Sequence, residues 1–267
     1  MLSTSLEQRG VKFQSEHITG LEVITPDQKR RLNQVFAVYF FPDLLEEDKF
    51  GPVRRIRASH SIDVALLLLA LPGDPNRAES LTTFGLFHDI GKVHPDLITH
   101  LTLGEPRTKE QKEALRAHPY YAALELQRLG LLDHADAIKY HHEKTDGSGY
   151  PYRLAGDDIP LTAGLLSIAD RIAAATNNDR SEDGKSIIAL RVIEKLREEL
   201  GVTIHELLET PLNILSERLE LDPALIQKIY SLSEEIVSRW QKDDFNSENT
   251  NIIDQVIAAA SSLYSRS

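Results

Sequence analysis

The sequence of 267 residues contains no cysteine. This absence excludes disulfide bonds, thiolate metal ligands and a cysteine nucleophile, and it fits a reducing cytosol. Any metal ion bound by the chain must therefore be held by histidine, aspartate or glutamate side chains.

A long hydrophobic segment is also lacking. The longest uninterrupted apolar run ends at Leu71 and is far shorter than the roughly 20 residues that a membrane-spanning helix needs. The N-terminus carries no hydrophobic segment of the signal-peptide kind. From these two features we expect a cytoplasmic protein without a membrane partner.

Basic residues are in deficit, with 30 Lys and Arg against 41 Asp and Glu, which gives a formal net charge of -11. Binding to duplex nucleic acid needs a basic surface that releases counterions, so no such partner is expected. An anionic small molecule would need a locally positive pocket, which bound divalent metal ions could supply.

Hydrophobic residues recur at helical spacing along most of the chain, and alternation of period two appears nowhere over a useful length. The predicted fold class is therefore all-α. The expected helices cover residues 28–40, 59–71, 79–90, 109–117, 131–143, 161–176, 186–200, 222–240 and 250–264. We expect an N-terminal helical extension in residues 1–50, a central domain in residues 51–183 and a helical C-terminal region in residues 184–267.

Local signals place several of these helix ends. Residues 72–76 combine Pro, Gly, Asp and Asn, which stop a helix. Thr108 and Gln111 have the spacing of a capping box, and Pro119 suits the first turn of the following helix. His118 is therefore expected at a break between two helices, from which its side chain can point into a cleft.

Histidines supply the most informative pattern. Those in settings that suggest chemistry are His60, His88, His118, His141 and His142, with His94 as a weaker sixth. His88 and Asp89 offer one imidazole and one carboxylate, and a carboxylate can bridge two cations through its two oxygens. A surface His-Asp pair followed by a Gly91 helix cap is the alternative.

Two further sites are ambiguous when taken alone. His141 and His142 are neighbours whose side chains would diverge by about 100° on a helix, although both could reach one cleft from its last turn. Asp170 lies in an apolar helical face, where an unpaired charge would cost several kcal/mol. Its partner could be Arg171 or Arg180, or it could be a metal ion.

Taken together, these residues resemble a known family. The ordered series His60, His88-Asp89, His118, His141-His142 and Asp170 is similar to the H…HD…H…HH…D series of HD-domain phosphohydrolases. Residues 142–151 resemble the HHE…DGSGYP loop of the HD-GYP group. The resemblance covers about residues 59–178 and implies an HD-superfamily helical bundle with a helical C-terminal extension.

The resemblance further implies a site with two divalent metal ions that Asp89 bridges. One ion would be held by His60, His88 and Asp170, and the other by His118, His141 and His142. Iron or manganese suits such nitrogen and oxygen ligands, and zinc, nickel or cobalt would also bind. A water or hydroxide shared by the two ions would be the nucleophile.

Substrate contacts are implied in the same way. Lys92 would contact the scissile phosphate or stabilise the charge that builds on it; a helix C-terminal cap is its alternative. Gly149 lets the backbone approach a ligand, and Tyr150 is available to stack or hydrogen bond, unless the loop is a purely structural turn. The candidate substrate-binding residues are Lys92, Asp146, Gly149, Tyr150 and Arg180.

Basic residues just before His60 are expected to serve a different purpose. Arg54, Arg55 and Arg57 are interpreted as a solvated face rather than a substrate clamp.

The chain departs from the HD-GYP pattern in three places, one of which is residues 169–174, Ala-Asp-Arg-Ile-Ala-Ala, where many members have ADxxDA. Ile56 stands four residues before His60, where some members have a glutamate for a third metal. We therefore expect two metal ions per chain and Ile56 packed against the cleft wall. The RPY-basic segment that helps many members hold the dinucleotide is replaced by residues 177–181, Asn-Asn-Asp-Arg-Ser.

The predicted function is that of a metal-dependent phosphodiesterase. It would hydrolyse a cyclic dinucleotide, cyclic di-GMP first, to the linear dinucleotide or the mononucleotide, with Asp89 and Lys92 as catalytic residues. Three alternatives are an HD phosphatase or nucleotidase for another phosphorylated small molecule, a di-iron oxygenase and a non-catalytic nucleotide sensor. The oligomeric state is open, with a homodimer as one option.

Overall fold

Helices make up the architecture of the computed structural model, which describes residues 23–41, 49–70, 78–101, 107–144, 146–178, 223–242 and 251–264. Within these residues there is no strand, and an isolated antiparallel bridge joins Asp146 and Ala155. The all-α prediction is confirmed. Among the described helices, none combines the length and the apolar character that crossing a membrane requires.

The order of the elements follows the predicted helices closely. The structure contains α2 (Pro26–Phe40), α3 (Gly51–Ala70), α4 (Ala78–Phe87), η3 (Ile90–Val93), α5 (Pro95–Ile98), α6 (Lys109–Leu115), α7 (His118–Arg128), α8 (Leu132–Lys139), η4 (Gly156–Asp158), α9 (Leu161–Asn178), α12 (Pro223–Lys242) and α13 (Ile252–Tyr264). The turn expected at residues 72–76 and the helix expected at residues 186–200 lie outside the described residues.

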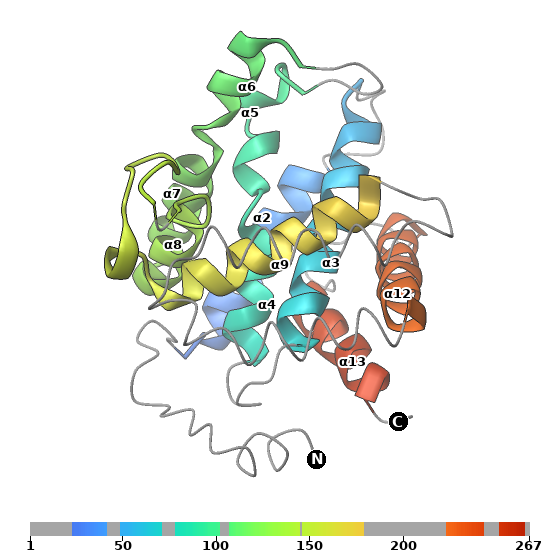
Figure 1. Ribbon diagram of the computed structural model, residues 1–267. Helices are drawn as coiled ribbons and strands as arrows, with labels where there is room; N and C mark the ends of the chain where they lie inside the picture. Colours follow the sequence, from blue (N-terminus) through green and yellow to red (C-terminus); the bar gives the residue numbers. More distant parts are fainter. Residues whose placement is uncertain are drawn as a thin grey trace.

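Helix α3 is the centre of the bundle. Most of its side chains from Ala58 to Leu68 are buried, as expected of a helix that is apolar on nearly all sides. It packs against α2, α4, α9, α12 and α13. Figure 1 shows α9 running obliquely across α3 and α4, with α7 and α8 at its far end.

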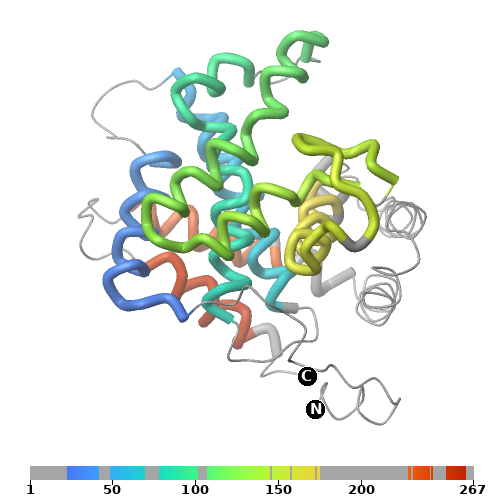
Figure 2. Tube along the Cα trace, turned by 90° about the vertical axis from the view of Figure 1, so that its left-hand side faces the viewer, coloured from blue at the N-terminus to red at the C-terminus, as the bar shows by residue number. Residues whose placement is uncertain are grey.

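Helices from the two ends of the chain complete the core. Figure 2 shows α2 beside α13. The side chain of Asn33 on α2 connects the two helices through hydrogen bonds. Its amide donates to Asn251 Oδ1 over 3.1 Å, and its Oδ1 accepts from the backbone nitrogen of Ile252 over 3.0 Å. Trp240 of α12 packs edge-on against Phe36 of α2, with ring centroids 5.2 Å apart. The predicted extensions thus share one hydrophobic core with the central helices.

The capping box at Thr108 is confirmed, because its hydroxyl accepts from Gln111 N and its own N–H donates to the Gln111 side chain. His118 follows a turn and begins α7, as the position of Pro119 predicted.

Three predicted helix ends were wrong. Helix α3 begins eight residues earlier than predicted, at Gly51, α4 ends at Phe87 instead of Ile90, and α8 ends at Lys139 before the histidine pair. The chain turns into η3 after α4, where a Cβ on Gly91 would lie 2.1 Å from the carbonyl oxygen of His118. Helix α4 therefore does not continue, and the backbone of η3 instead lies close to the backbone at the start of α7.

Glycine also sets the distance between α3 and α4. A Cβ on Gly85 would lie 2.3 Å from Ala65 Cα, a separation that only movement of one helix could relieve. We predict that Gly85→Ala lowers the free energy of unfolding by about 3 kcal/mol, as overpacking against backbone does. Urea unfolding followed by circular dichroism measures this change.

Gly51→Ala is the matched control, because a Cβ there meets nothing closer than Arg55 Nη1 at 4.0 Å. It should leave the unfolding midpoint almost unchanged. Equal midpoints for the Gly85 variant and the original protein would contradict the proposed close packing of α3 on α4.

Candidate metal centre

Three histidines of the site are held in the same way, each just beyond the last turn of a helix. Their Nδ1 atoms donate to the carbonyl three residues earlier: His88 to Gly85 over 2.7 Å, His118 to Leu115 over 2.7 Å, and His141 to Ile138. The last carbonyls of a helix lack intrahelical partners, so they are free to accept these bonds. Each imidazole is thereby fixed in orientation.

These bonds also fix which ring nitrogen faces the site. A carbonyl only accepts, so Nδ1 carries the hydrogen and a neutral ring presents the lone pair of Nε2. Burial lowers the pKa of His118, and it lowers the pKa of His141 to about 3. The pKa of His142 is held well below its ordinary value by burial and by the neighbouring His141 and His118 rings. These three rings are therefore neutral near pH 7 and available as ligands.

Side chains from α3, from α9 and from the residue after α4 form a first cluster, the His60 group, which consists of His60, His88 and Asp170. One ligand atom from each lies within 4.8 Å of the others. His60 Nε2 is 2.9 Å from Asp170 Oδ1, and His88 Nε2 is 3.5 Å from the same oxygen. Burial opposes the charge of Asp170, but the hydrogen bond with His60 and the nearby His88 ring hold its pKa well below the ordinary value.

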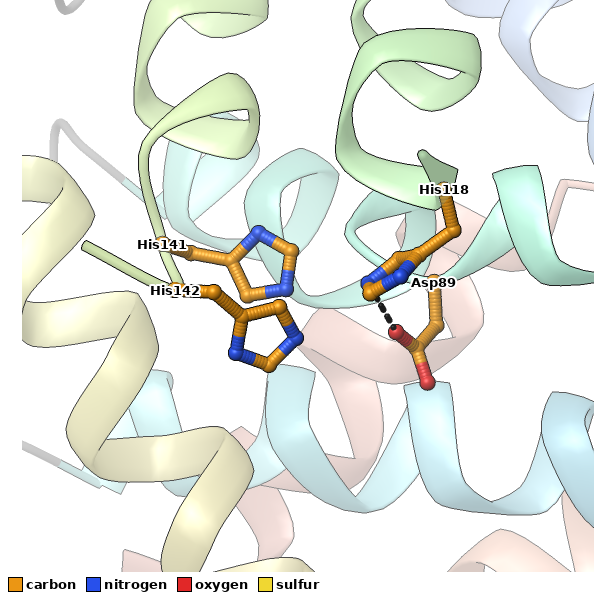
Figure 3. Close-up of side chains that lie close together, drawn as sticks. All are labelled: Asp89, His118, His141 and His142. Carbon is orange, nitrogen blue, oxygen red and sulfur yellow. Dashed lines mark ion pairs between the residues drawn. The ribbon is translucent and has the colours of Figure 1, made fainter. Parts of the chain in front are cut away.

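A second cluster, the Asp89 group, contains Asp89, His118, His141 and His142, whose ligand atoms also lie within 4.8 Å of one another. Figure 3 shows His141 and His142 extending from one side toward His118 and Asp89. His118 Nε2 lies 3.2 Å from Asp89 Oδ1, close enough for an ion pair.

Asp89 belongs to the Asp89 group and also lies close to two members of the His60 group. Its Oδ1 is 3.6 Å from His88 Nε2, and its Oδ2 is 3.9 Å from His60 Nε2. Both of these histidines belong to the His60 group. The carboxylate is fully buried, so it can reach both groups without meeting bulk solvent.

Several ligand atoms in these groups are buried without a hydrogen-bond partner among the described residues. They are Nε2 of His88, His118, His141 and His142, and Oδ1 of Asp89. Each such atom costs roughly 1–3 kcal/mol when it stays unsatisfied. Divalent cations satisfy neutral imidazole nitrogens and carboxylate oxygens together, so the residues present fit metal binding.

Charge favours a cation at the same place. Burial alone would lower the pKa of His88, yet the carboxylates of Asp89 and Asp170 raise it above its ordinary value. The two carboxylates thus attract positive charge to the position that His88 Nε2 faces.

Lys92 lies beside this centre on η3. Its Nζ donates to Asp89 Oδ2 over 2.6 Å, and its side chain is partly exposed. Burial opposes ionisation of Asp89, but the positive charge of Lys92 and the neighbouring His88 and His118 rings hold the Asp89 pKa well below its ordinary value. Lys92 is therefore placed to act on an anion that approaches Asp89.

Residues 142–151, here called the GYP loop, place Tyr150 against the Asp89 group. The Tyr150 ring stacks on His142 with centroids 4.7 Å apart, and the Arg116 guanidinium lies 5.3 Å from the Tyr150 ring centroid. Glu143 anchors the chain after the loop, because its carboxylate accepts from the backbone of Tyr152 at 2.6 Å and Leu154 at 3.0 Å.

Two other predicted substrate-binding residues, Asp146 and Gly149, make contacts within the loop itself. Asp146 is exposed and accepts from Ser148 N over 2.8 Å. A Cβ on Gly149 would lie 2.4 Å from Lys144 N, so this glycine allows the loop to fold back on itself. Their contact with substrate remains a prediction, and Arg180 lies outside the described residues.

A cavity of about 510 Å³ borders the GYP loop. Its lining includes Glu113, Arg116, Ser148, Tyr150 and Arg153, and none of the seven candidate metal ligands. Tyr150 therefore lies between this cavity and His142.

Some sequence-based interpretations were wrong. Arg57 does not belong to a solvated face: its Nη1 lies 3.9 Å from Asp89 Oδ2, and only 22% of its side chain is exposed. Ile56 is 50% exposed instead of packed against the cleft wall. His94 lies outside both groups and stacks on Tyr121, with centroids 4.3 Å apart.

Arg107 is a further residue near the site that the sequence did not single out. It precedes α6, is half-buried, and interacts electrostatically with Arg57 and Asp89. An isolated arginine after a proline offers no local signal of this placement.

The candidate ligands fall into the two groups that the resemblance implied, with Asp89 between them. Their role as metal ligands remains a prediction.

Several relatives of the chain are named as cyclic dinucleotide phosphodiesterases. The chain is 33% identical over 181 residues to a cyclic di-GMP phosphodiesterase of Pseudomonas aeruginosa, covering 58% of this chain and 42% of that protein. A cyclic di-GMP phosphodiesterase response regulator of Xanthomonas campestris is 34% identical over 177 residues, with 63% and 43% covered. A 3'3'-cGAMP-specific phosphodiesterase of Vibrio cholerae is 38% identical over 101 residues, with 36% and 19% covered.

The chain spans less than half the length of each of these relatives. Residues 43–201 match the HD domain, and this range includes every side chain of both groups. This match extends over more than half of the 267 residues. The chain therefore belongs to the HD domain family.

Proposed function

We propose that this chain is a metal-dependent phosphodiesterase that opens a cyclic dinucleotide, with cyclic di-GMP as the first candidate. The observation that carries the proposal is the pair of buried ligand groups on either side of Asp89, with unsatisfied Nε2 atoms in both. Hydrolysis would add water across one P–O bond of the ring and release the linear dinucleotide, or the mononucleotide after a second cleavage.

The proposed site holds two divalent ions, iron or manganese first. The His60 group would take one ion, the other three histidines would take the second, and Asp89 would offer one oxygen to each. When bound, such a pair would provide a nucleophilic water at neutral pH and neutralise phosphate charge. Ile56 supports a count of two metal ions, because an aliphatic side chain four residues before His60 offers no oxygen to a third ion.

Lys92 would act on the reacting phosphate. Its ammonium lies 2.6 Å from Asp89 Oδ2, so a phosphate bound at Asp89 would be within its reach. A fixed positive charge at that point stabilises the negative charge that increases on the phosphate oxygens in the transition state.

Tyr150 would shape the substrate side of the site. Its ring is fixed by stacking on His142, and it borders the 510 Å³ cavity. A cavity of that size, with an aromatic wall and the Arg116 guanidinium, suits a nucleobase, which binds by stacking and by hydrogen bonds at its edge.

The substrate class is supported by the relatives. Those named above act, by their names, on cyclic di-GMP or on 3'3'-cGAMP. Both are rings closed by two phosphodiesters, so the proposal rests on what the two molecules share.

We predict that Asp89→Asn lowers turnover of cyclic di-GMP by roughly a thousandfold or more, because several kcal/mol of transition-state stabilisation come from the metal pair. The amide keeps the shape of the side chain but loses the charge between the two groups. Chromatographic detection of the linear product measures turnover, and elemental analysis of the same sample should show less bound metal.

Asp136→Asn on the exposed face of α8 is the control and should keep activity and metal content. An Asp89→Asn protein with full activity and full metal content would refute the site. Activity of the original protein on phosphate monoesters alone would instead indicate a phosphatase.

Tyr150→Ala is expected to act on substrate affinity. Loss of the ring should raise KM roughly tenfold, the effect of one lost stacking contact, while metal content stays unchanged. Tyr150→Phe keeps the ring and should remain within about twofold of the original KM. Loss of metal from the alanine variant would show that Tyr150 supports the ligands instead.

A further inference from the structure

Two basic side chains converge on one oxygen of Asp89 and a third interacts electrostatically with this carboxylate, although the chain as a whole carries a formal net charge of -11. Lys92 Nζ lies 2.6 Å from Asp89 Oδ2, and Arg57 Nη1 lies 3.9 Å from the same oxygen. The third, Arg107, interacts electrostatically with both Arg57 and Asp89. They come from three separate segments: η3, α3 and the residues just before α6.

Arg57 is placed one turn before His60 on α3, so its guanidinium is carried to the site by the same rigid helix as a candidate ligand. Its Nε is buried without a hydrogen-bond partner among the described residues. The side chain as a whole is 22% exposed, so a solute can still reach it. A planar guanidinium with free N–H groups suits a phosphate, which accepts two parallel hydrogen bonds.

Arg107 adds a second guanidinium on the same side. Burial is the main cause that lowers its pKa, the positive charge of Arg57 is the next, and the Asp89 carboxylate acts in the opposite direction. Arg57 and Arg107 carry like charges, so an anion between them would make them favourable neighbours.

Asp89 cannot supply that negative charge for all three cations. It is the one acidic side chain paired with Arg57 or Lys92 among the ion pairs of the described residues. In the proposed function its carboxylate is also shared between two divalent ions. The charges of Arg57 and Arg107 are then left without an acidic partner among the ion pairs of the described residues, which favours a negatively charged ligand beside them.

We propose that Arg57 and Arg107 form a phosphate-binding subsite for the second phosphate of the substrate, the one that is not being hydrolysed. The inference rests on the proposed function, in which Lys92 serves the reacting phosphate. It places basic contacts for the substrate on residues that precede His60 and α6 in the sequence. The subsite selects substrates with two phosphate groups over simple diesters.

The test compares two substrates in Arg57→Gln, which keeps a side chain of similar length without the charge. KM for cyclic di-GMP should rise roughly tenfold, the effect of one lost charge-assisted contact. For bis(4-nitrophenyl) phosphate, which has a single phosphate, kcat/KM should stay within about twofold. Elemental analysis should give the same metal content as in the original protein.

A binding measurement removes the dependence on turnover. Isothermal titration of the metal-loaded protein with a phosphorothioate analogue of cyclic di-GMP that resists hydrolysis should show an affinity loss of roughly tenfold in Arg57→Gln, and Arg107→Gln should weaken binding in the same direction. Arg57→Lys should restore part of the affinity, because it returns the charge without the planar fork. Arg55→Gln is the matched control, since Arg55 is exposed on the same helix, and it should match the original protein.

Each outcome decides the proposal. Unchanged KM and affinity in Arg57→Gln would overturn it, and so would an equal loss with both substrates, which would place Arg57 at the reacting phosphate. If the original protein hydrolyses no cyclic dinucleotide, the proposed function fails separately. Titration with inorganic pyrophosphate then decides the subsite: an affinity loss in Arg57→Gln relative to Arg55→Gln supports it, and equal affinities overturn it.

Discussion

Hydrogen bonds between imidazole Nδ1 atoms and the last carbonyls of three helices hold the centre of this structure together. The ends of α4, α6 and α8 each leave a carbonyl that His88, His118 and His141 use. A helix end that would otherwise need water or a cap thus becomes the support of a candidate ligand. The same bond sets the tautomer, so backbone geometry decides that Nε2 faces the centre of the site.

Asp89 is surrounded by two kinds of side chain, neutral histidines and positively charged lysine and arginine. On one side lie neutral, buried histidines whose pKa values are lowered, and on the other lie Lys92, Arg57 and Arg107. Neutral imidazoles accept a cation without first releasing a proton, whereas the basic side chains favour an approaching anion. An acidic protein can therefore bind an anionic ligand at one place, because the local arrangement outweighs the net charge.

The sequence predicted the helices well where apolar periodicity is long, as in α3 and α9, and where a local signal exists, as at Thr108. It predicted helix ends poorly, because the end of α4 is set by the approach of Gly91 to His118, a contact between distant segments. The two ligand groups follow the resemblance. Arg57 could not be assigned, since Arg54, Arg55 and Arg57 look alike in sequence and only the position of Asp89 distinguishes them. Arg107 offered no pattern at all.

Anomalous diffraction from crystals of the active protein, recorded at the absorption edge of the metal that elemental analysis identifies, tests the central claim most directly. The account predicts two peaks separated by roughly 3.5–4 Å, as in other two-metal sites. One peak should lie among His60, His88 and Asp170, the other among His118, His141 and His142, and Asp89 should contact both. An active protein with one peak, or with peaks away from these residues, would contradict the account.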